Sequence, residues 1–560
     1  MKVLSSSWFK LFTVVIINLV FFISWKFSFD AAEKAMYKAG FSLPVSNVPS
    51  SYIRENQNKI DVLEYDMSIE LFYNQEQIKG DVIITGRILD KTIEQIDLNF
   101  YDNYHIEKVS LNGRETDYEI EDMHISVPLI NNVNDTFEVR IVYRGTPEKR
   151  GLASFSFDEY KNRPVIYSLN EPIFASTWFP CNDKPDDKAQ LELRITNDSS
   201  KVSLSNGKLI DIITKGNKRT YHWKTIYPIS TYLICLYSAD YSHFSDVYVS
   251  GKDTMSIDYY VFPEHREMAE IDFSEHLDYM NYFKSVFGEY PFIKEKYGVA
   301  EFLWQMGAME HQTITGIGSN FLNGRGMFNE FYIHELAHQW FGNAVGPGTW
   351  KDIWLNEGFA SYAEALYSEY KYGFASYKSI MQQKFQTEFS GTLYNPDYLF
   401  SSTVYDKGAW VVHMLRWELG DSTFFNLIRT YYDKYKYAIA TTQDLLHLSN
   451  KVSGKNLEKF FDQWLFTGTG IIKMNYHQED LKKNGQNVIR IILTQVQDGY
   501  ENYNFPLEVV LKDQNGKEYF RNIFYIDKPE KVIEITGDSG SEIVFDPDSW
   551  LLAEFIKKQE

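Results

Sequence analysis

Hydrophobic and polar positions alternate along the first half of the chain. From residue 60 to 245, short alternating runs such as 61–71, 80–89 and 136–143 are separated by Asn, Gly and Asp turn signals. A period of two is typical of strands that bury one face. The pattern therefore predicts an N-terminal β domain over 60–245.

A helical periodicity follows and is clearest at 328–338 and 410–419. Beyond residue 470 the alternation returns, for example at 488–493. These patterns predict a mainly α domain over 246–470 and a small β domain over 471–560. The fold class expected from the whole chain is multidomain α+β.

The amino terminus carries the pattern of an export signal. Lysines precede the apolar run 11–25, which is short for a membrane span and fits a signal peptide or N-terminal membrane anchor over 1–26. No small-x-small cleavage site follows, because Trp25, Phe27 and Phe29 are bulky, so an uncleaved anchor stays open beside a cleaved signal peptide. Residues 27–59 are expected to be a linker. We therefore expect an exported protein, membrane-anchored or secreted/periplasmic after cleavage, with a buried N-terminal helix as the alternative.

Composition and charge narrow the classes of function. A chain of 560 residues is too long for a single hydrophobic core, so several domains are expected. Its composition, 44% hydrophobic and 24% charged residues, is typical of a globular protein. A formal net charge of −20 argues against nucleic acid as a partner. Two cysteines, Cys181 and Cys235, allow at most one disulfide and do not identify the compartment.

The segment His334-Glu335-Leu336-Ala337-His338 carries the most specific chemistry. On a helix, positions i and i+4 share one face, so both imidazoles can reach one cation. Glu357, 19 positions further on, supplies a third ligand. Two imidazoles and one carboxylate are the ligands of a catalytic zinc with one position open to water, so we expect one Zn²⁺ per chain. Glu335 projects toward that water as a general base. The alternative interpretation, two unrelated core or surface histidines, does not account for Glu357.

Several further motifs occur in a characteristic order. They are Glu171-Pro172, Phe179-Pro180-Cys181-Asn182-Asp183-Lys184-Pro185, Gly307-Ala308-Met309-Glu310-His311, Trp350-x-Asp352-x-Trp354-Leu355-Asn356-Glu357-Gly358-Phe359-Ala360 and Tyr405-Asp406-Lys407-Gly408. Together with the histidine motif, this set closely resembles the M1 family of zinc aminopeptidases (gluzincins) over residues 60–550. The resemblance implies an N-terminal β-saddle domain, a thermolysin-like catalytic domain and a small C-terminal β-sandwich. Because the chain ends soon after Trp550, we expect the large helical C-terminal domain of many members to be absent.

The resemblance also implies a role for each matching residue. The implied function is a zinc-dependent aminopeptidase that hydrolyses single N-terminal residues from peptides through a zinc-bound water activated by Glu335. Tyr405 would stabilise the developing oxyanion, and Glu310 and Glu171 would bind the free α-ammonium group. The implied zinc ligands are His334, His338 and Glu357, and the further substrate contacts are backbone groups of Gly307 and Ala308 and the side chain of Met309.

Some points stay open at the level of sequence. His311 stands where asparagine is usual in the family, and Ser176 stands where many members carry arginine, so both put subsite preference in doubt. Glu364 is either a hydrogen-bond partner of a metal-bound imidazole or a surface acid. Two alternative functions remain, a catalytically silent peptide-binding scaffold and a zinc endopeptidase. Glu310 and Glu171 count against the endopeptidase, because two acids would disfavour an uncharged main-chain segment.

Overall fold

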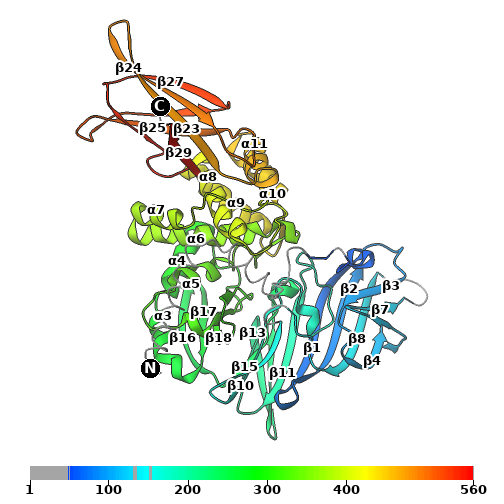
Figure 1. Cartoon of the computed structure of the whole chain (residues 1–560). Coiled ribbons are helices and arrows are strands. Elements are labelled where there is room, and N and C mark those ends of the chain that lie inside the picture. Colours follow the sequence, from blue (N-terminus) through cyan, green and yellow to red (C-terminus); the bar gives the residue numbers. More distant parts are fainter. Residues whose placement is uncertain (1–47, 50, 130–134, 151–153, 559–560) are drawn as a thin grey trace, which may run out of the picture.

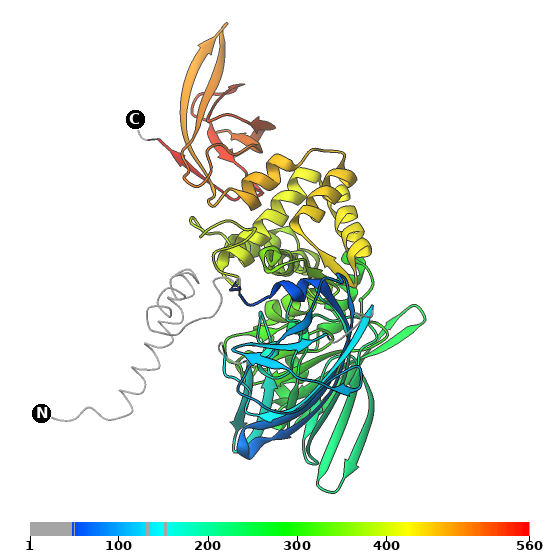
Figure 2. The same cartoon turned by 90° about the vertical axis from the view of Figure 1, so that its right-hand side faces the viewer.

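The computed structural model describes residues 48–49, 51–129, 135–150 and 154–558. The predicted signal or anchor segment 1–26 therefore lies outside the described residues. Within the described part of the chain, no helix is both long and apolar enough to cross a membrane. The described chain forms an N-terminal β domain, a central domain and a C-terminal β domain, which lies at the far end of the helices in both views (Figure 1, Figure 2).

The end of the predicted linker is packed against the N-terminal domain, contrary to the sequence expectation. The hydroxyl of Tyr52 donates to the Ile173 carbonyl at 2.9 Å, and a 3₁₀ turn, Glu55–Lys59, follows. The Gln57 side-chain amide donates to Asn99 and Asn182, and both Tyr52 and Gln57 are buried. These specific hydrogen bonds order a segment whose composition is typical of a linker.

The N-terminal domain is built on an eight-stranded sheet with the order β13-β14-β11-β1-β2-β8-β4-β5. The alternating burial of β1 puts its apolar side chains into the core, as the sequence pattern predicts. The strands of this sheet are β1 (Ile60–Phe72), β2 (Gln77–Ile88), β4 (His105–Leu111), β5 (Arg114–Glu115), β8 (Thr136–Gly145), β11 (Gln190–Asp198), β13 (Lys208–Lys215) and β14 (Lys218–Lys224).

Two smaller sheets complete this domain. The three-stranded sheet has the order β3-β7-β6, and the four-stranded sheet has the order β12-β15-β10-β9. Cys181 and Cys235 are buried and both are free, so the single disulfide that the sequence allows is not formed. The strands are β3 (Gln95–Asn99), β6 (Glu119–Glu121), β7 (His124–Pro128), β9 (Phe155–Tyr160), β10 (Arg163–Ser168), β12 (Val202–Leu204) and β15 (Tyr237–Ala239).

The central domain begins with a five-stranded sheet of order β16-β17-β18-β20-β19. The predicted domain boundary at 245/246 falls inside β16, which pairs with β17 and so belongs to the central domain. The sequence predicted mainly helix here, but β18 and β20 are short and buried on both faces, so they carry no alternation. The strands are β16 (Ser242–Ser250), β17 (Asp253–Val261), β18 (Tyr297–Phe302), β19 (Ala308–Met309) and β20 (Thr315–Gly318).

Helices fill the rest of the central domain, as their periodicity predicts. They are α3 (Arg266–Asp272), α4 (His276–Phe287), α5 (Asn329–Ala337), α6 (Trp354–Tyr372), α7 (Phe374–Gln383), α8 (Gly408–Leu419), α9 (Asp421–Tyr435), α10 (Thr442–Ser453) and α11 (Glu458–Phe461). A short parallel pair, β21 (Val345–Pro347) and β22 (Ala438–Ala440), joins the loop after α5 to the loop after α9. Helices α5 and α6 pack against each other, and this contact brings the predicted metal ligands together.

The C-terminal domain contains a four-stranded sheet, β27-β24-β23-β29, and a three-stranded sheet, β26-β25-β28. The ring of Phe545 in the second sheet contacts Tyr476 and Phe555 of the first, with centroids 4.9 and 5.0 Å apart. The strands are β23 (Ile472–Lys483), β24 (Gln486–Gln495), β25 (Phe505–Lys512), β26 (Glu518–Ile526), β27 (Glu530–Thr536), β28 (Glu542–Phe545) and β29 (Ala553–Lys557).

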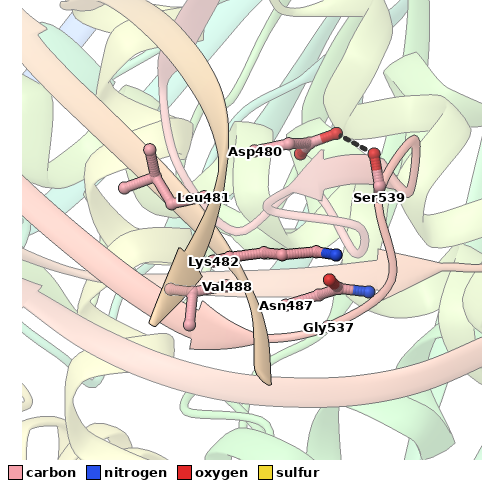
Figure 3. A pocket seen from close by; sticks show the side chains of 7 residues that line it. All are labelled: Asp480, Leu481, Lys482, Asn487, Val488, Gly537 and Ser539. Carbon is pink, nitrogen blue, oxygen red and sulfur yellow. Dashed lines mark hydrogen bonds between the residues drawn. The ribbon is translucent and has the colours of Figure 1, made fainter. Parts of the chain in front are cut away.

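The loop after β28 packs against helix α8 and so connects the C-terminal domain to the central domain. The Trp550 ring stacks on His413 and Trp417 of α8, with centroids 4.7 and 5.1 Å apart. A surface pocket on this domain, shown in Figure 3, lies between β23, β24 and the loop after β27. It contains the hydrogen bond from Ser539 to Asp480, 2.6 Å, and none of the predicted site residues lines it.

Candidate active site

Helices α5 and α6 bring the three predicted metal ligands together. Nε2 of His334 and Nε2 of His338 lie 3.0 Å apart, and each lies 3.3 Å from Oε2 of Glu357. His334 is on α5, His338 caps its end, and Glu357 is in the first turn of α6. The loop between the helices turns at Gly342, φ +125°, where a side chain would come within 3.3 Å of Nδ1 of His338.

This donor set fits a zinc ion. Three donor atoms, two imidazole nitrogens and one carboxylate oxygen, lie within 4.8 Å of one another, and all three residues are largely buried. Three protein ligands of these types leave the fourth position that catalytic zinc sites keep for water. Buried donors this close together, with no other cation among them in the described structure, are arranged for a metal.

Each imidazole is oriented by a partner on its other nitrogen. Nδ1 of His334 lies 2.8 Å from Oε1 of Glu364, and Nδ1 of His338 lies 3.1 Å from the Phe341 carbonyl. Such partners hold a proton on Nδ1 and leave the Nε2 lone pair for a metal. Glu364 is buried in this contact and is not a surface acid. Burial would raise its pKa, but Lys384 and His334 outweigh that effect and lower it.

Glu335 lies beside this set without joining it. Glu335 is 6% exposed, and its Oε2 has no hydrogen-bond partner among the described residues. Burial raises the pKa of Glu335 to about 8, the nearby imidazoles oppose that shift, and Glu310 and Glu357 reinforce it. An unpartnered carboxylate next to the metal position is free to exchange a proton with a reacting molecule.

A second group of acids adjoins the metal ligands. Glu171, Glu310 and Glu357 each place a carboxylate oxygen within 4.8 Å of the others. Oε1 of Glu171 and Oε1 of Glu310 are buried and lack a hydrogen-bond partner within the described residues. Burial raises the pKa of Glu171 well above its ordinary value, and the neighbouring acids Glu310 and Glu357 raise it further. Buried carboxylates without partners favour a cationic ligand between them.

The strand directly before Glu310, β19, lies at the edge of the central sheet. In β19, Ala308 and Met309 pair with Ile317 and Gly316 of β20, and no strand of the described residues pairs with the other side of β19. The Gly307 carbonyl accepts from the Gly318 amide at 3.1 Å. The unpaired edge offers backbone groups to an extended chain, as in strand addition.

Two side-chain amides just after α5 bond to the segment that follows β19. Gln339 donates to the carbonyls of Glu310 and His311 at 3.4 and 3.3 Å and accepts from the Thr313 amide at 2.9 Å. Asn343 donates to the Glu310 carbonyl at 2.6 Å. No sequence motif indicated either residue. Their proximity to His338 was the available signal, but their partners lie about 30 positions away.

Tyr405 lies beside the predicted metal ligand His334. It lies in a π-helical turn, Thr403–Lys407, directly before α8, and its ring stacks on His334 with centroids 5.9 Å apart. Burial raises the pKa of Tyr405 well above its ordinary value, and Glu357 adds to the shift. The phenol therefore keeps its proton at neutral pH and can donate a hydrogen bond.

The two departures from the family pattern are both buried away from solvent. Nδ1 of His311 lies 2.6 Å from the Tyr237 hydroxyl, and burial lowers the pKa of His311 to about 3, so the imidazole is neutral. The Ser176 hydroxyl lies 2.9 Å from the Tyr52 hydroxyl, in the packed segment before β1. Neither side chain contacts a metal ligand in the described structure.

Comparison with known families agrees with this geometry. The Peptidase M1 N-terminal domain matches residues 62–233, and the Peptidase family M1 domain matches residues 272–464. The chain therefore belongs to peptidase family M1, as its motifs predict, and membership indicates a zinc cofactor. The N-terminal β domain and the central domain together have the M1 aminopeptidase fold.

Relatives and solved structures extend the comparison. Probable aminopeptidase 1 of Sulfurisphaera tokodaii is 24% identical over 67% of this chain and 50% of its own length, and aminopeptidase N of Lactococcus lactis is 26% identical over 75% and 52%. The chain thus spans about half the length of these relatives. The structure of Legionella pneumophila aminopeptidase A in complex with aspartic acid has a TM-score of 0.79 at 18% identity, covering 90% of this chain and 60% of that chain. An M1 zinc metallopeptidase from Deinococcus radiodurans has a TM-score of 0.64 at 24% identity, covering 72% and 93%.

Proposed function

We propose that this protein is a zinc-dependent aminopeptidase that removes single N-terminal residues from peptides. The observation that carries the proposal is that the predicted metal ligands adjoin a pair of buried acids. A three-ligand metal set lies directly beside Glu171 and Glu310, whose buried carboxylate oxygens lack partners in the described structure. The free α-ammonium group of a peptide is a cation that would pair with those oxygens. The first peptide bond of that peptide would then lie near the metal.

Substrate would bind as an extended chain with its amino end at the acids. Glu171 and Glu310 neutralise the ammonium group, and backbone groups of Gly307 and Ala308 pair with the substrate main chain along the edge of β19. Met309 lines the position of the first side chain, where its flexible thioether accommodates different apolar groups. An internal or acylated residue would leave two buried carboxylates unpaired, and this cost makes the site an exopeptidase.

The chemistry is hydrolysis of the first peptide bond. His334, His338 and Glu357 would hold the zinc, which when bound polarises the scissile carbonyl and makes water nucleophilic near neutral pH. Glu335 accepts a proton from the attacking water and returns it to the leaving amine. The Tyr405 phenol donates a hydrogen bond to the oxyanion that develops on the former carbonyl oxygen.

The remaining expectations from sequence are part of the same proposal. The amino-terminal pattern over 1–26 supports export, either with an uncleaved membrane anchor or with release after signal cleavage. Partition of the tagged full-length protein between membrane and soluble fractions would test the anchor. The two C-terminal sheets, joined by contacts of Phe545, support a β-sandwich as the closing domain.

The decisive experiment compares two leucyl substrates that differ only at the amine. Full-length zinc-loaded protein is given a fluorogenic leucyl substrate with a free amine and its N-acetylated counterpart. Hydrolysis of the free-amine form alone supports the aminopeptidase, and cleavage of both shows that the acids do not select the amine. If neither is cleaved, other N-terminal residues are scanned with the folded, zinc-loaded sample. Failure of every one would favour the catalytically silent scaffold.

A further inference from the structure

A buried ion pair lies directly behind the metal ligand His334. One oxygen of Glu364, Oε1, lies 2.8 Å from Nδ1 of His334, and the other, Oε2, accepts from Nζ of Lys384 at 2.7 Å. The side chains of Glu364 and Lys384 are only 10% and 13% exposed. The three groups form one chain of hydrogen bonds that ends at the metal position.

A helical hairpin brings Lys384 to this place. Helix α6 ends before Gly373, φ +86°, and α7 folds back along α6. Hydroxyl pairs hold the two helices together, with Tyr362 2.8 Å from Tyr377 and Ser368 2.7 Å from Ser376. Lys384 caps the end of α7 and so lies beside Glu364, 20 positions earlier in the chain.

The groups around the Glu364 carboxylate make Lys384 necessary for holding that carboxylate in position. Within the described part of the chain, His334 and Lys384 are the basic groups within 4.0 Å of the Glu364 carboxylate. The carboxylate is therefore held between a directional ammonium donor on one oxygen and the imidazole on the other. A buried anion that loses its cation either rotates toward other donors or draws in water.

The two metal-ligating imidazoles are supported differently. Nδ1 of His338 faces the neutral backbone carbonyl of Phe341, which the turn after α5 holds in place. Nδ1 of His334 instead faces the side-chain carboxylate of Glu364. This side chain can change its rotamer, because no backbone turn holds it in place. The orientation of the His334 ring thus depends on whatever fixes Glu364.

We propose that Lys384 is a positioning residue for the metal centre: its ammonium group holds Glu364 against Nδ1 of His334 and so directs Nε2 of that imidazole at the zinc. This role deepens the proposed function, and it rests on His334 being a zinc ligand, not on the choice of substrate. Lys384 acts through Glu364 and touches neither metal nor substrate.

The test measures zinc affinity of the full-length protein by competition with a chromophoric chelator. Lys384→Met keeps the length of the side chain and removes the charge, and we expect zinc affinity to fall about 10- to 100-fold. Lys384→Arg, which retains the charge, should recover most of the loss. Lys378→Met is the matched control, because Lys378 lies on the same helix and donates to the Pro547 carbonyl instead. Wild-type zinc affinity in Lys384→Met would overturn the proposal.

A double-mutant cycle with Glu364→Gln separates positioning from general destabilisation. If Lys384 acts through Glu364, Lys384→Met should change zinc affinity little in the Glu364→Gln background. A nonspecific loss of folding would persist in that background, so equal losses in both backgrounds would refute the role. The cobalt-substituted protein gives a second readout, since its visible absorption should shift in Lys384→Met and not in Lys378→Met. Zinc affinity and cobalt absorption report on the metal site alone, so an inactive enzyme with these results would contradict only the proposed function.

Discussion

Replacing Glu310 by Gln tests the selection of a free amine most directly. The substitution keeps the size of the side chain and removes one of the two charges proposed to face the substrate ammonium. Oε1 of Glu310 has no partner among the described residues, and the residue is 4% exposed, so little compensating interaction is lost within the protein itself. The effect should therefore appear in substrate binding and turnover more than in stability.

The magnitude follows from the geometry of the acids. An ammonium and a carboxylate about 4 Å apart attract by about 4 kcal/mol at an effective dielectric constant of about 20. Glu171 and Glu357 still offer oxygens within 4.8 Å of the Glu310 position, and desolvation offsets part of the attraction. We therefore expect a net loss of about 2 to 3 kcal/mol, which lowers kcat/KM for free-amine substrates about 30- to 150-fold.

The assay measures kcat/KM for the free-amine and N-acetylated leucyl substrates with Glu310→Gln. Only the free-amine value should fall, because the acetylated substrate carries no ammonium group. Glu508→Gln is the control, since Glu508 is a buried acid that pairs with Arg521 in the C-terminal domain. An unchanged kcat/KM for the free amine, or an equal fall in Glu508→Gln, would refute the assignment of Glu310.

Three further predictions concern other parts of the central domain. Tyr405→Phe should lower kcat about 100- to 1,000-fold at unchanged zinc content; a loss below threefold would contradict its role at the oxyanion. Gly408→Ala places a Cβ 2.8 Å from Cα of Gly358, so α6 and α8 must separate; we expect a loss of about 1 to 3 kcal/mol and a melting temperature several degrees lower, and an unchanged melting temperature would contradict the close packing. Burial lowers the pKa of His413 to about 3, against about 6.5 in an unfolded chain. The stability that this neutral imidazole contributes is full above pH 6.5 and is lost as the pH falls toward 3, by about 2 kcal/mol at pH 5. His413→Gln should therefore reduce the fall in melting temperature between pH 7.5 and 5, and equal falls in variant and wild type would contradict the shift.

Local sequence patterns determined much of this protein. The i, i+4 spacing of His334 and His338 requires that both rings lie on one face of a helix, whatever the rest of the fold does. Alternating apolar residues likewise required strands in the N-terminal and C-terminal domains, because a half-buried strand exposes every second side chain. The ordered motifs predicted membership of peptidase family M1, and the family comparison confirmed it.

Only the tertiary structure decided which distant residues meet. Glu171 lies in a different domain from Glu310, and Lys384 reaches Glu364 only because Gly373 turns α7 back along α6. The strands β18 and β20 also escaped prediction, since strands buried on both faces carry no alternation. Periodicity reports whether a residue is buried locally. It carries no information on how one element packs against another. That packing determines which residues contact the acids and the imidazoles.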